Sequence, residues 1–450
     1  MAVPYPSYRR YEGDWLSELP AHWGRRRIKF LTTFMVSGGT PATGTDDYWG
    51  GDVPWVSPKD MKVARITHTE DYITEDGVRG SAARLVPPQT LLMVVRSGIL
   101  RHSIPVALSG REVAINQDIK GVGFLPSVDP AYVRYFIEGL QGELLTRWSK
   151  VGTTVESIES EYFANDDVPV PPLLEQTAII DFLDRETGRI DALIDKKRRL
   201  LELLEENRLA VITNAVTKGL DPKAPMKDSG IDWLGQIPAH WDVKRVKFSK
   251  SLVTSGSRGW AEYYADEGPI FLQSGNLGTQ AELNLTNLQH VNPPDGAEGR
   301  RTAVCVDDVM VCITGARTGT VAHVSVELGE AYINQHIALL RPIKSDVFPK
   351  FLAYALWCDA GRQQLSLSSY GMKEGLGLQH VLAVMTTSPP IGEQEAIVQY
   401  IDREQERLNS IALHTHRAIG LLLEYRSALI TNAVTGNIDV RGEASKEVAA

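Results

Sequence analysis

The chain has 450 residues, of which 43% are hydrophobic, and its 47 Lys and Arg residues against 56 Asp and Glu residues give a formal net charge of −9. This length predicts several domains, and the hydrophobic fraction excludes wholesale disorder. The sequence has no apolar run long enough to span a bilayer, no apolar signal region at its start, and 3 Cys residues in neither a disulfide nor a metal-ligand spacing. We therefore expect a soluble, cytoplasmic protein with no membrane partner.

The first predicted element is a globular segment that ends near residue 170. Short β-rich runs such as Leu91–Val95 alternate there with turn signals such as Gly38-Gly39 and Pro87-Pro88, and residues 129–148 have a helical pattern. This mixture predicts an α/β or α+β domain. The basic cluster at Arg25–Arg27, like the later one at Lys244-Arg245, is interpreted as solvated surface.

A long helix follows Pro171-Pro172, which end the preceding strand. Its apolar residues fall on two heptad columns, which are typical of a coiled coil. The first column holds Ile179, Leu193 and Leu200, and the second holds Leu183, Ile190, Leu204 and Val211. Such a helix needs a partner with a matching apolar seam, since an isolated helix of this kind is poorly stable.

The rest of the chain repeats these elements in the same order, with the residue numbers shifted by 218. Pro20-Ala21-His22-Trp23 recurs as Pro238-Ala239-His240-Trp241, and Ile115-Asn116-Gln117 recurs as Ile333-Asn334-Gln335. Pro171-Pro172 with Glu175-Gln176 recurs as Pro389-Pro390 with Glu393-Gln394, and Ile212–Thr217 recurs as Ile430–Thr435. Several blocks in one register establish a tandem duplication.

The duplication predicts two globular domains and two long helices. We expect domains at 1–172 and 219–390, helices at 173–218 and 391–436, and a flexible tail at 437–450. The simplest partner for each long helix is the other long helix, and their pairing gives an antiparallel coiled coil with pseudo-two-fold symmetry. The alternatives are that each helix packs on its own domain or on another subunit.

The two copies diverge most over residues 37–110 and 255–325, where small shifts of register align them best. Ser97-Gly98, for example, matches Thr314-Gly315, where the shift in numbering is 217. An enzyme that repeats one active site would keep its chemistry alike in both copies. A frame that is kept while its loops vary favours a reader of two different targets.

Residues for catalysis or metal binding do not stand out in the sequence. His residues are scattered, no lysine follows a glycine-rich phosphate loop, and Gly375-Leu376-Gly377 is too short for a dinucleotide fingerprint. Asn292-Pro293-Pro294 is followed by Asp295, where amino-methyltransferases need an aromatic residue, so a turn is the better interpretation. We expect a protein that is not an enzyme, with neither a catalytic nor a metal site.

These blocks together resemble the DNA-specificity (S) subunit of type I restriction–modification systems, over roughly residues 11–440. The resemblance is carried by Gly38–Pro41, Tyr48–Trp55, Arg96–Gly98, Asn116-Gln117 and Pro171–Gln176, and in the second copy by Asp228–Gly235, Thr314-Gly315, Asn334-Gln335 and Pro389–Gln394. The second copy departs from the pattern at Ser255–Trp260, which replaces the Gly-Gly-Thr-Pro and Trp-Gly-Gly blocks.

The resemblance implies a non-catalytic subunit that binds double-stranded DNA. Each globular domain would be a target-recognition domain that reads one half of a bipartite site, and the helices would set the spacing and dock two modification (methyltransferase) subunits. Those partners would carry S-adenosylmethionine, and restriction subunits would add ATP- and Mg-dependent translocation and cleavage, so this chain itself would bind no cofactor. The alternative is a non-catalytic scaffold with two divergent protein-binding domains.

Base reading needs Arg, Lys, Asn, Gln and small hydroxyl side chains at loop positions. The candidates are Ser37, Thr40, Lys59, Arg96 and Arg101 in the first domain, and Arg258, Gln273, Asn276, Arg317 and Thr318 in the second. The Asn-Gln pairs at 116–117 and 334–335 occur in both copies and are predicted to hold the scaffold. For the same reason Trp15, Trp23, Trp233 and Trp241 are predicted to be core residues.

Overall fold

A computed structural model describes residues 4–12, 15–150, 155–294, 296–368 and 375–442. The chain divides into two compact units. Unit 1 contains residues 1–197 and 417–450, and unit 2 contains residues 198–416. Each unit therefore contains one globular domain and one half of each long helix, whereas the sequence placed domain boundaries at the helix ends. In the described ranges, no helix has an apolar stretch that could cross a membrane.

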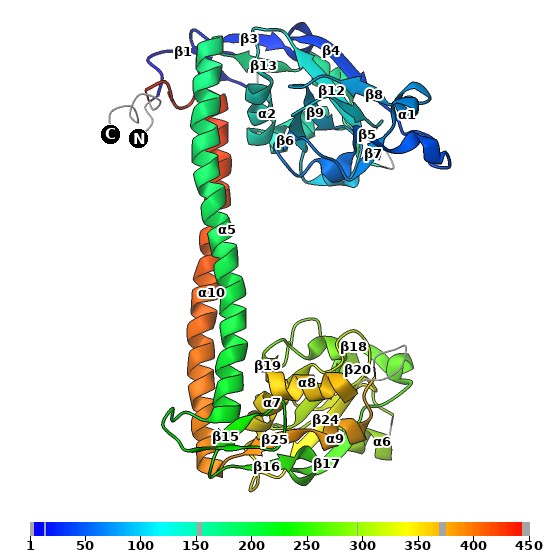
Figure 1. Cartoon of the computed structure of the whole chain (residues 1–450), viewed down its shortest axis with the longest axis vertical. Helices are drawn as coiled ribbons and strands as arrows, with labels where there is room; N and C mark the ends of the chain where they lie inside the picture. The colour runs from blue at the N-terminus through cyan, green and yellow to red at the C-terminus, as the bar shows by residue number, and fades with distance from the viewer. Residues whose placement is uncertain (1–3, 13–14, 151–154, 295, 369–374, 443–450) are drawn as a thin grey trace. The chain divides into compact units, whose positions relative to one another are not determined.

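The globular part of unit 1 is built on two sheets (Figure 1). The larger has the strand order β4 (Thr32–Ser37), β12 (Ile119–Phe124), β9 (Leu91–Val94), β10 (Val106–Ser109) and β6 (Arg65–Ile66). The smaller has the order β7 (Asp71–Ile73), β5 (Trp49–Val56), β11 (Val113–Ile115) and β8 (Arg84–Val86). The short pairs are β1 (Tyr8–Arg10) with β2 (Glu18–Pro20), and β3 (Gly24–Arg27) with β13 (Asp167–Val170).

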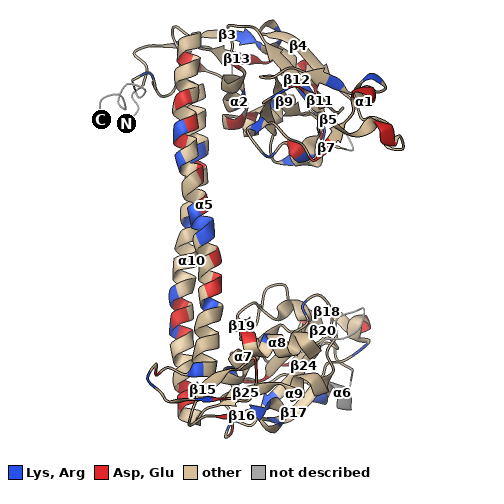
Figure 2. Cartoon of the chain, viewed as in Figure 1, with Lys and Arg blue, Asp and Glu red and all other residues tan. Residues whose placement is uncertain are grey.

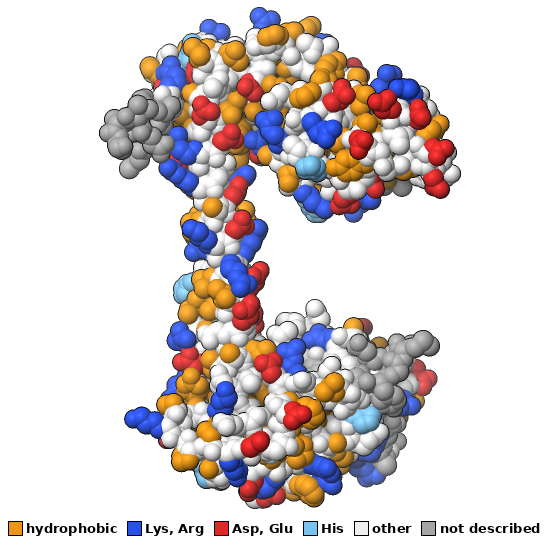
Figure 3. Space-filling model, viewed as in Figure 1, with side chains coloured by type: hydrophobic (Ala, Val, Ile, Leu, Met, Phe, Trp, Pro, Cys, Tyr) orange, Lys and Arg blue, Asp and Glu red, His pale blue; other side chains and the backbone are white. Residues whose placement is uncertain are grey.

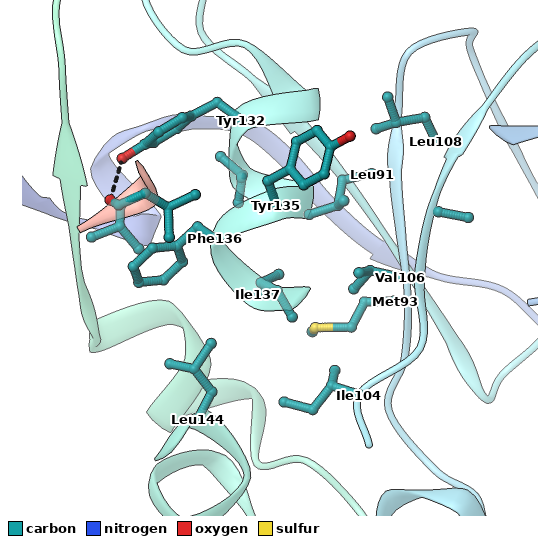
Figure 4. Packing of buried hydrophobic residues seen from close by; sticks show 14 of the residues in the cluster. Leu91, Met93, Ile104, Val106, Leu108, Tyr132, Tyr135, Phe136, Ile137 and Leu144 are labelled. Atoms are coloured by element: carbon teal, nitrogen blue, oxygen red, sulfur yellow. Dashed lines mark hydrogen bonds between the residues drawn. The ribbon is translucent and has the colours of Figure 1, made fainter. Parts of the chain in front are cut away.

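Helices complete unit 1. They are α1 (Glu75–Arg79), α2 (Pro130–Gly139), α3 (Gln141–Trp148) and α4 (Ser160–Asn165), and α2 and α3 together occupy the predicted helical stretch 129–148. Helix α2 begins at an Asp129 N-cap with Pro130 in its first turn, and it packs on β9 and β10. Figure 4 shows Ile137 of α2 facing Met93 and Val106, while Tyr132 lies on another side of the helix. This apolar layer is the core of unit 1.

Unit 2 repeats this plan. Its larger sheet has the order β17 (Lys250–Ser255), β24 (Ile337–Pro342), β21 (Val309–Cys312), β22 (Val321–His323) and β19 (Ala281–Glu282). Its smaller sheet has the order β20 (Gln289–Val291), β18 (Tyr264–Leu272) and β23 (Ala331–Ile333), and the short pairs are β14 (Met226–Asp228) with β15 (Gln236–Pro238), and β16 (Asp242–Arg245) with β25 (Met385–Ser388). The helices are α6 (Ala297–Thr302), α7 (Pro349–Trp357), α8 (Asp359–Ser368) and α9 (Leu378–Ala383).

The repeat persists where the two sequences diverge. In unit 1 Leu85 of β8 pairs with Ala114, and in unit 2 the same ladder position is kept as a single bridge between Ala303 and Tyr332. The predicted change of register at Ser97-Gly98 is wrong. Arg96 forms a β-bridge with Ser157, and Thr314 forms one with Gly375. Both residues of the second bridge are numbered 218 higher than those of the first, which is the shift that relates the other repeated blocks. Elsewhere a small shift does occur: Trp55 pairs with Ala114 and Phe271 pairs with Tyr332, so β5 and β18 are related by a shift of 216.

The long helices are α5 (Leu173–Lys218) and α10 (Ile391–Val434), which confirms the predicted pair. In unit 1 the first half of α5 lies beside the last part of α10 in antiparallel orientation, and Arg426 donates a hydrogen bond to Asp191. Glu175 in the first turn of α5 and Gly436 just after α10 both lie near Trp23. In unit 2 the second half of α5 packs in the same sense on the first part of α10, where Arg208 reaches Gln405 and Asn409.

The apolar seam of α5 differs in part from the predicted columns. Ile179, Leu183, Ile190 and Leu204 are buried as expected, whereas Leu193 and Leu200 are 43% and 39% exposed and Ile194 is buried instead. An α-helix has about 3.6 residues per turn, so a strict seven-residue column drifts around its surface. Residue spacing alone could not locate that drift.

The end of the chain also packs on unit 1. Residues 437–442, assigned to a tail by sequence, include Val440, which is fully buried in the unit 1 core, and Asp439, which forms an ion pair with Arg441. Residues 443–450 of the same predicted tail lie outside the described residues.

Candidate nucleic-acid interface

Four loops meet at one edge of the two sheets in unit 1, because β4, β5, β9 and β11 all end there. The backbone N–H of Gly38 donates to the carbonyl of Asn116 over 3.1 Å, and the N–H of Asn116 donates to Val56 over 3.1 Å. The N–H of Val95 donates to Asp118 over 2.8 Å. The loop at 116–118 therefore joins the loops that follow the other three strands.

Unit 2 has a corresponding junction, in which the N–H of Gly256 donates to the carbonyl of Ile337 instead of Asn334. The N–H of Asn334 donates to the carbonyl of Leu272, and the N–H of Ile313 donates to His336. Glycine is required where the first loop leaves its strand. A Cβ on Gly38 would lie 1.8 Å from the carbonyl oxygen of Ile115, and one on Gly256 would lie 2.0 Å from that of Asn334. We call this four-loop edge the recognition edge of each unit.

The Asn of each Asn-Gln pair stabilises this junction. The side-chain oxygen of Asn116 accepts a bond from the N–H of Asp118 over 2.9 Å, and that of Asn334 accepts from His336 over 3.1 Å. Both Asn side chains are buried. Gln117 is exposed and accepts a bond from Thr40, so it belongs to the surface of the edge. The scaffold role thus fits the Asn of each pair, and Gln117 lies among the candidate readers.

The recognition edge of unit 1 brings together most of the first-domain candidates. Ser37 is the exposed last residue of β4, and Thr40 donates to Gln117 over 2.8 Å. Lys59 is exposed in the turn at Pro58–Asp60, which a capping box of Ser57 and Asp60 holds. Arg96 forms an ion pair with Asp118 at 2.9 Å, joining two of the loops.

Arg101 is the exception among the first-domain candidates. It lies at the end of the 3-10 turn Gly98–Arg101 and forms an ion pair with Glu156 at 3.1 Å. That glutamate belongs to the segment before α4, not to the four loops, although the N–H of Ser97 also donates to its carbonyl. Arg101 therefore extends the recognition edge toward α4.

Most of the second-domain candidates lie in two loops that are hydrogen-bonded to each other at the recognition edge of unit 2. The Arg317 guanidinium donates to the carbonyls of Gly275, over 3.5 Å, and Leu277, so the loop after β21 holds the loop after β18. Gln273 donates to the Tyr264 hydroxyl over 3.1 Å, and Thr318 donates to the Gly315 carbonyl over 2.6 Å.

Asn276 and Arg258 differ most in exposure. Asn276 is 6% exposed, and its side chain accepts from the Gln273 N–H over 2.9 Å and donates to the Asn284 carbonyl over 3.1 Å. It therefore supports the loop. Arg258 is exposed beside Ser257, which pairs with Asn334, and among the described residues it forms no ion pair. Its charge is free to meet a ligand.

Two residues at these edges were not identified from sequence. Lys120 of β12 lies opposite Ser37 in the ladder, and burial lowers the pKa of its ammonium from the ordinary value, partly offset by Glu159. His336 is bonded to Thr314 through its Nδ1 atom. The sequence signal for Lys120 was a lysine within the apolar run of a strand. The signal for His336 was its position directly after the repeated Asn-Gln pair.

The tryptophans shared by the copies do not all lie in the core. Trp23 and Trp241 are buried, as predicted. Trp15 is half-buried against Phe136, with the Arg147 guanidinium over its ring. Trp233 is 39% exposed, so the prediction is wrong for this residue. The described residues contain no group of three or more His, Cys, Asp or Glu side chains that could hold a metal ion.

Parts of the chain are similar to known proteins. The family model "Type I restriction modification DNA specificity domain" matches residues 20–203. The chain is 34% identical to the EcoR124I/EcoR124II specificity subunit of Escherichia coli over 170 residues, which are 38% of this chain and 42% of that protein. It is 27% identical to the MjaIX specificity subunit of Methanocaldococcus jannaschii over 57% of this chain and 58% of that protein.

This chain is therefore similar to the type I DNA-specificity family over residues 20–203. It spans about half the length of these two curated relatives. A chain in a structure of a type I R-M system has the same fold as this chain, with a TM-score of 0.72 at 17% identity, covering 93% of this chain and 99% of that one. The HsdS subunit of Thermoanaerobacter tengcongensis gives a TM-score of 0.52, also at 17% identity, over 93% and 98% of the two chains.

Proposed function

We propose that this chain is the sequence-specific DNA-binding subunit of a type I restriction–modification complex, in which each unit reads one half of a bipartite site. The observation that carries the proposal is the recognition edge. Both units have a four-loop junction with corresponding bonds at Asn116 and Asn334, yet the side chains that it presents differ, with Lys59 and Arg96 in one unit and Arg258 and Arg317 in the other. One frame with two sets of polar loops suits two different half-sites.

The candidate readers have suitable chemistry for this task. Arg and Lys donate to guanine, Asn and Gln pair with adenine, and hydroxyl groups contact either bases or phosphates. We assign base or phosphate contacts to the exposed candidates, namely Ser37, Thr40, Lys59, Arg96, Arg101, Arg258 and Arg317. The half-buried Gln273 and Thr318 belong to the recognition edge of unit 2, and Asn276 gives the loop of Gln273 its shape.

The net charge of −9 is compatible with this proposal, because binding depends on where the positive charge lies. Figure 2 shows acidic and basic residues interspersed along the chain. The ion pairs of Arg96 with Asp118 and of Arg101 with Glu156 hold these guanidinium groups in place before DNA arrives. A phosphate or a guanine would then compete with the carboxylate for each guanidinium.

The long helices have two tasks in the proposal. They set the spacing between the half-sites, and they dock two modification subunits. Those subunits would bind S-adenosylmethionine and methylate adenine, and restriction subunits would supply ATP- and Mg-dependent cleavage. The chain itself would bind none of these cofactors and would act in the cytoplasm.

A loop exchange within this chain tests the proposal. Residues 37–116 are replaced by residues 255–334, because both segments begin and end at equivalent positions of the junction. The variant is assembled with the modification subunits, and its methylation sites are mapped by single-molecule sequencing of plasmid DNA. We expect the first half-site to change to the sequence of the second while the second stays unchanged.

The reverse exchange, with residues 37–116 in place of 255–334, is the matched control and should duplicate the first half-site. If both variants kept the original bipartite target, the recognition edges would not read DNA. A scaffold with two protein-binding domains would then be the better description.

A further inference from the structure

Both units expose a phenylalanine at the same position of the repeat. Phe30 is 61% exposed and Phe248 is 62% exposed. Three basic residues precede each of them, namely Arg26, Arg27 and Lys29 in unit 1 and Lys244, Arg245 and Lys247 in unit 2, and all six are exposed. We call each set of four residues the basic–aromatic patch. An apolar ring among cations, repeated in two copies, needs a physical reason.

The local fold holds each ring outward. In unit 1 the patch runs from β3 into the 3-10 turn Ile28–Phe30, where Ile28 is 1% exposed. In unit 2 it runs from β16 into the turn Val246–Phe248, where Val246 is fully buried. Because the buried residue anchors each turn, the phenylalanine two positions later points to solvent. The ammonium of Lys29 lies 5.2 Å from its ring centroid, and that of Lys247 lies 4.6 Å from the other.

Protection of a strand edge explains only part of the patch. β3 pairs with β13 in a two-stranded sheet, and β16 pairs with β25 in another, so each has an open edge in the described structure. Charged side chains on an open edge discourage pairing with another chain. An exposed phenylalanine has the opposite effect, because it offers apolar surface to a partner. The rings therefore indicate binding.

The patch is separate from the recognition edge. Phe30 lies just before β4, and Ser37 of the recognition edge ends that strand. At about 3.3 Å per residue, six strand residues separate the two surfaces by roughly 20 Å. The recognition edges differ between the units while the patches keep three cations and one phenylalanine. The patches therefore suit a partner that is the same for both units.

The chemistry of the patch favours a protein partner. Aromatic side chains and Arg are enriched at the centres of protein interfaces, where they supply most of the binding energy. A phosphate backbone would use the cations and gain nothing from the ring. Among the described residues, Arg26, Arg27, Lys244 and Arg245 form no ion pair, so their charge is available to acidic groups. Figure 3 shows basic side chains (blue) beside hydrophobic ones (orange) where Figure 1 places β3 and the β16–β17 region.

We propose that each basic–aromatic patch docks one copy of the same partner protein, which receives the phenylalanine in an apolar pocket with an acidic rim. The partner is the modification subunit, so this inference rests on the proposed function and adds a contact outside the long helices. The first unit binds one copy through Phe30, and the second binds another through Phe248.

Titration of the modification subunit onto the purified full chain, followed by native mass spectrometry, tests the proposal. The wild-type chain should bind two copies. Phe30→Ala or Phe248→Ala should weaken one binding event by roughly tenfold or more, and the double variant should weaken both. Arg27→Gln with Arg245→Gln should weaken both events at low salt and have less effect at high salt, because salt screens exposed charges.

The matched control is the double variant Leu85→Ala with Leu285→Ala, which truncates one exposed apolar residue in each unit away from the patches. It should bind two copies with wild-type affinity, and all variants should keep the wild-type melting temperature. If the double phenylalanine variant bound both copies normally, the patch proposal would be wrong and the proposed function would stand. If the wild-type chain bound no copy, the proposed function would fail together with this inference.

One further result would also overturn the patch proposal. The arginine variants could lose affinity for random-sequence DNA while the double phenylalanine variant keeps its modification subunits. The cations would then contact DNA, and the patch would not be a protein-docking surface.

Discussion

The indole N–H of Trp23 donates to the carboxylate of Glu175 over 3.0 Å, and Trp241 makes the same bond to Glu393 over 2.8 Å. His22 and His240 each lie 2.8 Å from the same carboxylates. The repeated Pro-Ala-His-Trp segment therefore binds the first turn of each long helix. This contact explains why two short motifs far apart in the sequence recur together.

Removing one partner of this contact should destabilise the unit that contains it. Trp23→Phe keeps most of the buried ring but leaves Glu175, which is 5% exposed, with one donor fewer. We expect the free energy of unfolding of unit 1 to fall by about 1–2 kcal/mol. This free energy is measured by urea denaturation, with the helical circular dichroism signal as the probe of unfolding. Trp233→Phe, at an exposed tryptophan, should change it by less than about 0.5 kcal/mol.

Arg208 and Arg426 occupy equivalent positions on α5 and α10, and their replacement should have unequal effects. The Arg208 side chain is 1% exposed and donates to Gln280 over 3.0 Å and Asn409 over 2.8 Å. Arg426 is 29% exposed and pairs with Asp191, which is 50% exposed, at 2.9 Å. We expect Arg208→Ala to cost about 2–4 kcal/mol, because it removes a fully buried side chain and a donor to the buried Gln405 amide, and Arg426→Ala about 0–1 kcal/mol.

Chemical denaturation of both variants checks this difference. Arg208→Met separates the two parts of the effect, because it keeps an apolar stem and removes the donors. Equal losses for Arg208→Ala and Arg426→Ala would show that the contact with Gln280 adds nothing to stability.

His323 should make the stability of unit 2 depend on pH. Burial lowers the pKa of this imidazole below its ordinary value of about 6.5, and Asp307, at 3.2 Å from Nε2, opposes the shift only in part. Lys350 lowers the pKa further, while Asp402 raises it. As the pH falls below about 6.5, the unfolded state binds a proton before the folded state does, so stability is lost.

Thermal unfolding between pH 7 and pH 5 measures this loss, and His323→Gln should flatten the profile. Asp307 acts in a different range. Its pKa is lowered with help from Lys344 and His323, so its contribution is present above its ordinary value, near 3.8, and is lost only in stronger acid. An unchanged slope in the His323 variant would assign the pH dependence to another group.

Arg258 should contribute to one half-site only. If its free guanidinium contacts a base, Arg258→Ala should weaken binding of the second half-site by about 1–3 kcal/mol and relax its sequence preference. Binding assays with DNA mutated in either half-site, made on the complex with modification subunits, separate the two effects. Lys59→Ala is the counterpart in unit 1 and should affect the other half-site. Equal losses at both half-sites would indicate a general effect on DNA affinity.

Helix length should control the permitted spacer. Removal of one heptad from each long helix, residues 199–205 and 410–416, keeps the phase of the apolar seam because a heptad is close to two helical turns. We expect the methylated sites to shift to a shorter spacer while both half-sites stay the same. A variant with one heptad added to each helix should lengthen the spacer. Unchanged spacer selectivity in folded variants would contradict the ruler role.

The long helices could be predicted from the sequence because strong local signals coincide. Pro171-Pro172 precede α5, the apolar spacing identifies it as a helix, and Gly219 follows Lys218 with a φ of +75°, which favours glycine. The exposure of Leu193 and Leu200 could not be predicted, because it depends on how far the helix rotates against its neighbour.

The recognition edge could be predicted in part. Loop polarity identified Lys59 and Arg96 as candidate base-contacting residues, but not that their loops lie at one edge of the sheets. The bonds of Arg317 end on the backbone carbonyls of Gly275 and Leu277, which any residue would present, so no side-chain pattern reveals them. The same limit applies to Trp233, because a repeated motif indicates equivalent position and not burial.

Unit 1 is assembled from two segments, residues 1–197 and 417–450, that flank unit 2 in the sequence, and this has a consequence for its biosynthesis. Leu429, Ile430, Ala433, Val434 and Val440 belong to the same core as Leu19 and Trp23. A ribosome must therefore translate as far as Val440 before unit 1, which contains residues 1–197, can complete its core. In nascent chains arrested shortly after residue 416, unit 1 lacks its second segment and should be accessible to chaperones and proteases. Every residue of unit 2 has been synthesised at that point.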